Sequence, residues 1–166
     1  MQIKKLSSSK IYQEVYNSLS FNDRLDASWG WDKNNTVRWP VGLQAKMDRW
    51  VNVSTKLKFL RENLVRAANR ESAHEIQITL DELYLIGESQ NWKCSFTNIP
   101  LEFQRGGTEW GGKWCNPYSC TIDRIDSTKG YIKGNVQLVV WKVNSIKSNL
   151  ADDDFVDICK RVAVTR

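Results

Sequence analysis

The amino-acid sequence predicts an α+β protein with a strand–loop–strand–helix unit near the C-terminus and a mainly helical N-terminal half. Three observations predict this class. Residues 120–149 pass from strand to turn to strand to helix patterns, residues 54–70 carry an apolar stripe at helical spacing, and residues 79–89 open with a helix-capping sequence. The 166 residues suffice for one domain with a modest core, so we expect a main domain over residues 54–166 and an N-terminal extension over residues 1–53.

The C-terminal unit is the best-defined part of the sequence. Residues 121–125 alternate apolar and polar side chains as a short strand does, and residues 127–134 have the composition of a turn. The apolar run 136–141 predicts a second strand, and residues 141–147 can continue as a helix. This arrangement places Asn144 about one helical turn beyond the end of the second strand.

Composition and charge limit the class of partner. Lys and Arg number 24 against 19 Asp and Glu, a formal net charge of +5, which favours a polyanionic partner. The eight Trp residues also lean toward nucleic acid, because Trp stacks on bases, although several are needed for the core. No apolar run is long enough to span a membrane and the first residues lack the apolar core of a signal peptide, so we expect a cytoplasmic protein without a membrane partner.

The four cysteines do not predict a metal site. Cys115 and Cys120 are the closest pair, with four residues between them, unlike the Cys-x-x-Cys pairs of structural zinc sites. A structural zinc is therefore not expected. Cys159 falls within a predicted amphipathic helix, where we expect a buried free thiol.

The residues of the C-terminal unit carry a family resemblance. They read Asp123-Arg124-Ile125-Asp126, then Asn135-Val-Gln-Leu-Val, then Asn144 and Lys147, and residues 93–101 upstream read Lys-Cys-Ser-Phe-Thr-Asn-Ile-Pro-Leu. This order resembles the ββα-metal motif of HNH (His-Me finger) endonucleases, in which Asp-His ends the first strand, Asn opens the second and Asn or His on the helix completes a metal site. The upstream element is similar to the Cys-x-x-Thr-Gly-x-Pro-Leu block of small phage-type members, with Asn98 where Gly is usual. The resemblance covers about residues 54–160.

The resemblance implies an activity and a set of site residues. Asp123 and Asn144 would hold one Mg²⁺ or Mn²⁺, and Asn135 would bond to backbone and fix the loop. A single divalent ion of this kind neutralises the departing 3′ oxygen when a phosphodiester bond is hydrolysed. The implied protein is an endonuclease acting on double-stranded DNA, of the phage-encoded or homing type.

The sequence departs from the family at Arg124, which stands where the family has its general-base histidine. A guanidinium has no acceptor lone pair and cannot take a proton, so we expect Arg124 to bind phosphate instead. Three alternatives stay open. Asp126 accepts the proton, or metal-bound hydroxide or bulk water acts without a protein base. In the third, the protein is a catalytically inactive DNA-binding protein on a degenerate HNH scaffold. The one histidine, His74, lies far upstream. A protein partner bound through exposed Trp residues is a further class, without a specific motif.

From residue 41 to residue 70 the pattern is helical and basic, and Ser54 can cap a helix with Leu57, Leu60 and Leu64 on its apolar stripe. Beside an HNH-like unit, the basic side chains are expected to contact phosphate, with a solvated helix face as the alternative. The expected DNA-binding residues are Lys56, Lys58, Arg61, Arg66, Arg70, Lys129 and Lys147.

The remaining segments have structural interpretations. Residues 11–19 suggest a short helix, Thr79 and Glu82 form a capping box, and residues 92–103 predict a hairpin that packs against the C-terminal unit. Residues 104–119 are Gly-rich and predict an exposed loop. Residues 152–162 predict a last helix whose three leading aspartates suit the helix dipole rather than a metal.

Overall fold

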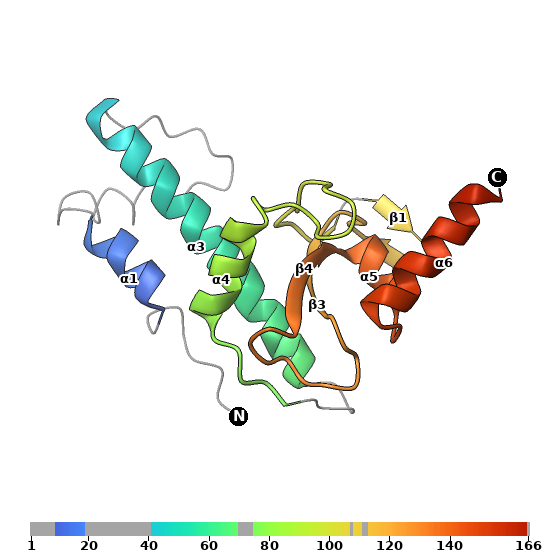
Figure 1. Ribbon diagram of the computed structural model, residues 1–166. Coiled ribbons are helices and arrows are strands. Elements are labelled where there is room, and N and C mark those ends of the chain that lie inside the picture. Colours follow the sequence, from blue (N-terminus) through green and yellow to red (C-terminus); the bar gives the residue numbers. More distant parts are fainter. Residues whose placement is uncertain (1–8, 19–40, 70–74, 107, 111–112, 166) are drawn as a thin grey trace. The chain divides into compact units, whose positions relative to one another are not determined.

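The computed structural model describes residues 9–18, 41–69, 75–106, 108–110 and 113–165 (Figure 1). In chain order the elements are α1 Lys10–Asn17, α3 Val41–Ala68, α4 Leu80–Ser89, β1 Thr108–Trp110, β2 Lys113–Cys115, β3 Cys120–Arg124, β4 Val136–Val140, α5 Trp141–Lys147 and α6 Asp152–Val164. Helices and antiparallel strand pairs occur together, so the fold is of the mixed α+β kind. Among the described residues, no helix has both the length and the apolar composition that crossing a membrane requires.

The chain divides into two compact units, Gln2–Lys58 and, together with Met1, Phe59–Arg166. The division therefore falls inside α3, whereas the sequence predicted it between residues 53 and 54. In the first unit, α1 begins after Ser9, whose side chain accepts a hydrogen bond from the Tyr12 amide. Residues 19–40, with their tryptophans and Arg38, lie outside the described part of the chain.

The helical pattern predicted from residue 41 onward is confirmed by α3, but the capping role predicted for Ser54 is wrong. Ser54 does not cap a helix: it lies inside α3, and its hydroxyl donates to the Val51 carbonyl at 3.1 Å. Residues 41–53 contain no proline and one glycine, so nothing in them interrupts the helix before Ser54. The predicted apolar stripe is confirmed, because Leu57, Leu60 and Leu64 are all buried.

The second unit is built on β3, β4 and α5, which follow one another as strand, loop, strand and helix (Figure 1). The strands pair antiparallel, with Cys120 opposite Val140 and Asp123 opposite Gln137. Leu138 and Val139 of β4 are fully buried. Both predicted strands and the helix after them are confirmed. They could be predicted because the patterns of strands and helices arise from local alternation and burial.

Two further elements pack beside this hairpin. The capping box of α4 is present, with Thr79 and Glu82 bonded to each other's backbone amides. The predicted hairpin after α4 is confirmed by the bridge between Lys93 and Pro100, and its Ser95 amide donates to the Leu138 carbonyl of β4 at 3.1 Å. Asn98, at its turn, has φ of 56°, a left-handed conformation that explains an Asn at a position favoured by Gly.

Two predictions about the C-terminal third are wrong. The Gly-rich segment 104–119 is not simply a loop, because β1 and β2 within it pair antiparallel, with Glu109 opposite Trp114. A Gly-Gly pair separates the two strands in the sequence, and such pairs favour tight hairpin connections. The predicted last helix is confirmed as α6, but Cys159 on it is exposed, because this helix buries only Phe155 among its own residues.

Candidate functional site

Asp123 and Asn144 approach the same part of the fold from different elements. Asp123 lies one residue before the end of β3 and is 4% exposed. Asn144 lies one turn into α5, and its Nδ2 donates to Thr121 Oγ1 at 3.1 Å and to the Ile122 carbonyl at 3.5 Å. These two bonds fix α5 against β3 beside Asp123, and both predicted ligands line one pocket.

The pocket has a volume of about 370 Å³ and a polar, net positive lining. Among the described residues that line it are three arginines, Arg66, Arg105 and Arg124, and one carboxylate, Asp123, so the charges of these residues sum to +2. Asn63, Asn144 and several Ser and Thr hydroxyls supply neutral donors and acceptors. Such a lining favours an anionic ligand with several oxygen atoms.

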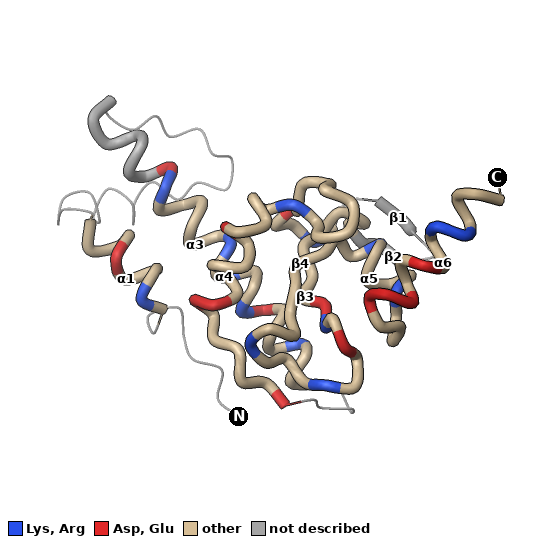
Figure 2. Tube along the Cα trace, viewed as in Figure 1, with Lys and Arg blue, Asp and Glu red and all other residues tan. Residues whose placement is uncertain are grey.

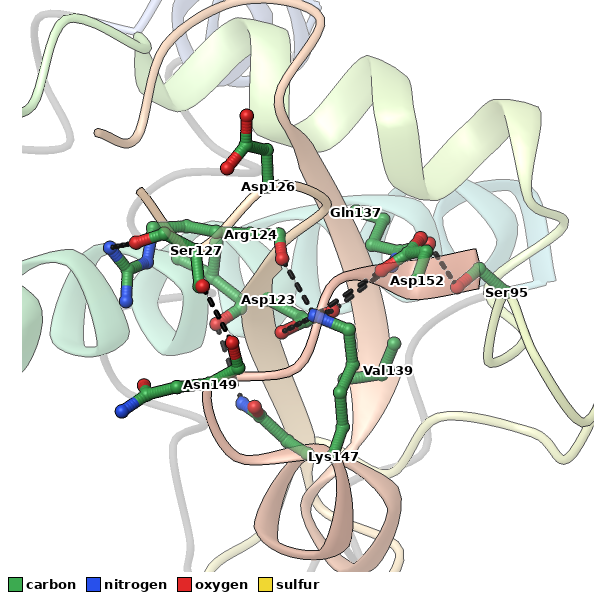
Figure 3. A network of polar contacts seen from close by, with 12 residues as sticks. Ser95, Asp123, Arg124, Asp126, Ser127, Gln137, Val139, Lys147, Asn149 and Asp152 are labelled. Atoms are coloured by element: carbon green, nitrogen blue, oxygen red, sulfur yellow. Dashed lines mark hydrogen bonds and ion pairs between the residues drawn. The ribbon is translucent and has the colours of Figure 1, made fainter. Parts of the chain in front are cut away.

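Lys147 is buried and bonds to the pocket-lining Asp123 within a network of ion pairs and hydrogen bonds (Figure 3). Its Nζ is 3.2 Å from each carboxylate oxygen of Asp123 and 3.2 Å from Asp152 Oδ1, and it donates to the Arg124 carbonyl at 2.8 Å. The prediction that Lys147 contacts DNA is therefore not met, because its side chain is 0% exposed and its ammonium is engaged inside the protein. Lys147 ends α5, where its side chain reaches back to the end of β3.

Gln137 connects the two carboxylates of this network. Its Nε2 donates to Asp123 Oδ2 at 2.9 Å and to Asp152 Oδ2 at 2.8 Å, while its Oε1 accepts from Ser95 (Figure 3). Asp152 is therefore more than the helix-dipole residue that the sequence suggested. A Gln on the second strand and an Asp opening a later helix carry no local signal that would join them in one network.

The donor atoms present suit a hard divalent cation. Asp123 Oδ1 accepts from Lys147, which leaves one of its lone pairs, and Asn144, whose side chain also carries an oxygen, lines the same pocket. Burial raises the pKa of Asp123, and the hydrogen bond from Gln137 and the charge of Lys147 act in the opposite direction. The nearby ammonium repels a second cation, so a metal would bind Asp123 against this repulsion.

Asn135 fixes the loop between the two strands. It accepts from the Asp126 amide at 2.9 Å and donates to the carbonyls of Asp126 and Gly130 at 3.0 Å each. These are backbone bonds of the kind that the family resemblance implies for this residue. Asn135 is 5% exposed, so the bonds are shielded from water.

Arg124 also holds this loop. Its Nη1 donates to the carbonyls of Ser127 at 2.6 Å and Lys129 at 3.1 Å, and its guanidinium lies 5.5 Å from the centre of the Tyr131 ring. Arg124 therefore orders the segment that borders the pocket while lining the pocket itself.

Asp126, the alternative proton acceptor, is not among the pocket-lining residues. Its carboxylate accepts from the amide and hydroxyl of Thr128 and pairs with Lys129 Nζ at 2.9 Å. The hydrogen bonds from Thr128 and Lys129 hold the pKa of Asp126 well below its usual range. A weakly basic carboxylate outside the pocket is a poor general base.

Of the other predicted DNA-binding residues, four lie on α3, where Lys and Arg are drawn blue (Figure 2), and Lys129 lies in the loop between β3 and β4. Arg66 is exposed and lines the pocket, Lys58 is exposed, and Lys56 and Arg61 are half-buried. Arg70 and His74 fall outside the described residues. Sequence reasoning missed Arg105, since a single Arg before two glycines carries no pattern.

Three comparisons with known proteins found no match. A scan against protein-family models gave no match, and searches of curated proteins and of solved structures gave none either. Within the described part of the chain, no three His, Cys, Asp or Glu side chains gather as a metal cluster. The class of protein is therefore described from the structure itself. It is an α+β unit with a polar, net positive pocket between β3, α5 and the end of α3.

Proposed function

We propose that this protein is an HNH-like DNA endonuclease that hydrolyses phosphodiester bonds with a single Mg²⁺ or Mn²⁺. The observation that carries the proposal is that Asp123, from the end of β3, and Asn144, from α5, line one pocket of net positive charge. The strand–loop–strand–helix order around them supports the same assignment.

Asp123 and Asn144 would hold the metal, and when bound it would stabilise the negative charge that develops on the scissile phosphate and the departing oxygen. The protein's own residues position the site and bind the DNA. Asn135 and Arg124 fix the loop between the strands through backbone carbonyls, and Lys147 and Gln137 fix the carboxylate of Asp123. The arginines of the pocket attract the phosphates of the DNA backbone.

A second candidate, a DNA-binding protein that does not cut, is favoured by one specific observation. The ammonium of Lys147 lies 3.2 Å from both oxygens of Asp123, where it compensates the charge that a metal would otherwise neutralise. The described residues that line the pocket also include no histidine, and the one carboxylate among them is Asp123 itself. A site without a separate proton acceptor binds phosphate more readily than it hydrolyses a phosphodiester.

Cleavage of supercoiled plasmid DNA in Mg²⁺ or Mn²⁺ separates the two candidates. The nuclease proposal predicts nicked or linear product with the wild-type protein, and loss of product in Asp123→Ala and Asn144→Ala. Asp154→Ala, which removes an exposed carboxylate on α6, serves as the control and should cut normally. Cutting that persists in both site variants refutes the assigned site, and salt-sensitive DNA binding without any cutting establishes the second candidate.

A further inference from the structure

Two arginines of the pocket, Arg66 and Arg105, come from segments far apart in the sequence. Arg66 lies in the last turn of α3, and Arg105 lies between the hairpin that follows α4 and strand β1. Both line the pocket that also contains Asp123. Neither belongs to the strand–loop–strand–helix unit that carries the proposed metal ligands.

The guanidinium of Arg105 is held in one orientation. It lies over the Phe59 ring at 4.6 Å, and its Nε and Nη2 are each 3.3 Å from Glu62 Oε2. Burial lowers the pKa of Arg105, and the positive charge of Arg66 lowers it further. Within the described part of the chain, Glu62 pairs with Arg105, and no ion pair to Arg66 is found there.

The pair has a fixed position relative to the proposed metal ligands. Asn63, one residue after Glu62 on α3, donates from Nδ2 to the Cys120 carbonyl at 3.2 Å. Cys120 opens β3, the strand that carries Asp123. A direct bond between helix and strand therefore ties the arginine pair to the strand that bears the catalytic carboxylate of the proposed site.

We propose that Arg66 and Arg105 bind a second, non-scissile phosphate of the DNA strand whose scissile phosphate lies beside Asp123. The inference rests on the proposed function for the identity of the ligand. Guanidinium forks match phosphate oxygens, and a DNA strand presents phosphates at regular intervals, so a pocket with positive charge away from the metal ligands suits two of them. A volume of about 370 Å³ lies at the lower end of the range for ligand pockets, about 300–1,000 Å³, and can accommodate a length of strand backbone.

The test is the salt dependence of DNA binding, measured by fluorescence anisotropy of a labelled duplex in EDTA, so that cleavage plays no part. The slope of the logarithm of the DNA-binding constant against the logarithm of salt concentration is negative, and each lost phosphate contact reduces its magnitude by about 0.9. Arg66→Gln and Arg105→Gln should each reduce the magnitude of the slope by less than about 0.9, and the double variant should reduce it by about 0.9 in total because both residues bind one phosphate. Lys160→Gln, at an exposed position on α6 outside the pocket, is the matched control and should change the slope far less.

Two more variants distinguish phosphate binding from a structural role of Arg105. Arg105→Lys keeps the charge and should retain most of the slope while weakening affinity, because an ammonium lacks the fork. Glu62→Gln removes the carboxylate that competes with phosphate for Arg105, so it should tighten DNA binding several-fold and steepen the slope. A purely structural ion pair predicts no gain in affinity in this variant.

The outcomes separate this inference from the proposed function. An unchanged slope in the double variant, with salt-sensitive DNA binding in the wild-type protein, overturns the phosphate site and leaves the nuclease proposal standing. Lowered slopes in a protein that never cuts plasmid DNA support the phosphate site and refute the nuclease. A wild-type protein with no salt-sensitive DNA affinity refutes both.

Discussion

The ammonium of Lys147 lies 3.2 Å from each carboxylate oxygen of Asp123, and both side chains are almost completely buried. Asp152 provides a second carboxylate at 3.2 Å from the same ammonium, so one lysine serves two acids. Gln137 adds a neutral donor to each acid. The geometry of Asp123, and with it the proposed metal site, therefore depends on a residue that touches no solvent.

Lys147→Met should be strongly destabilising, because methionine fills similar space but leaves Asp123 and Asp152 without their cation. Removing one partner of a buried ion pair costs about 3–5 kcal/mol. Urea denaturation at pH 7 measures the loss. Lys142→Met, on the exposed face of the same helix, is the control and should change the free energy of unfolding by less than about 0.5 kcal/mol. A loss below about 1 kcal/mol in Lys147→Met would mean that water or a cation replaces the ammonium.

The sequence predicted the elements that carry the site because their signals are local. Alternation over β3 and the apolar run of β4 set the strands, and the spacing from the end of β4 set Asn144 one turn into α5. The capping box of α4 is likewise a signal of four consecutive residues.

The network around Asp123 could not be predicted in this way, because it depends on contacts between separate segments. Lys147 has the same appearance in the sequence as any basic residue at the end of a helix, a place where the helix dipole favours cations. Its burial follows only when β3, Gln137 on β4 and the start of α6 meet around it. Arg105 was missed for the same reason, since Glu62 and Phe59 that hold it are on α3.

Gly130 and Gly134, in the loop next to the site, should respond differently to alanine. A Cβ at Gly130 would lie 2.3 Å from the Glu75 carbonyl oxygen, which accepts a 2.7 Å hydrogen bond from the Tyr131 amide. Because backbone must move, we expect Gly130→Ala to cost about 3 kcal/mol. Gly134 has φ of 82° with open space around it, so Gly134→Ala should cost only about 1–2 kcal/mol. Equal losses of unfolding free energy in the two variants would contradict this account.

The capping box of α4 should make stability depend on pH. Hydrogen bonds from the Thr79 backbone and side chain hold the pKa of Glu82 below its usual value of 4.5. A lowered pKa in the folded state means that this contribution is present above the unfolded pKa and is lost as pH falls through the folded value. The stability gap between wild type and Glu82→Gln should therefore be larger at pH 7 than at pH 3. Asp81→Asn removes a charge from the same turn but keeps the capping box. The difference in unfolding free energy between wild type and Asp81→Asn at the two pH values serves as the reference.

Arg124→His should raise DNA cleavage if the proposed nuclease lacks only its proton acceptor. Imidazole at this position provides a lone pair that guanidinium does not have, next to the carboxylate of the metal site. General bases contribute about 10²–10⁴-fold, and we expect a gain near the lower end because the substitution also removes the bonds to the Ser127 and Lys129 carbonyls. Initial rates on supercoiled plasmid in Mg²⁺, measured from pH 6 to 8, test this, and the gain should grow as the histidine loses its proton near pH 6.5.

Arg124→Gln is the matched comparison for this experiment, because it removes the same guanidinium but supplies no imidazole. Asn135 keeps its bonds to the Asp126 and Gly130 carbonyls in both variants, so the loop retains one of its two anchors. A rate that rises in Arg124→His and stays at or below wild type in Arg124→Gln assigns the missing function to a proton acceptor. If neither variant cuts faster while both remain folded and bind DNA, proton transfer is not what limits the reaction. That result would favour the second candidate, a DNA-binding protein without nuclease activity, in which the ammonium of Lys147 beside Asp123 prevents metal binding.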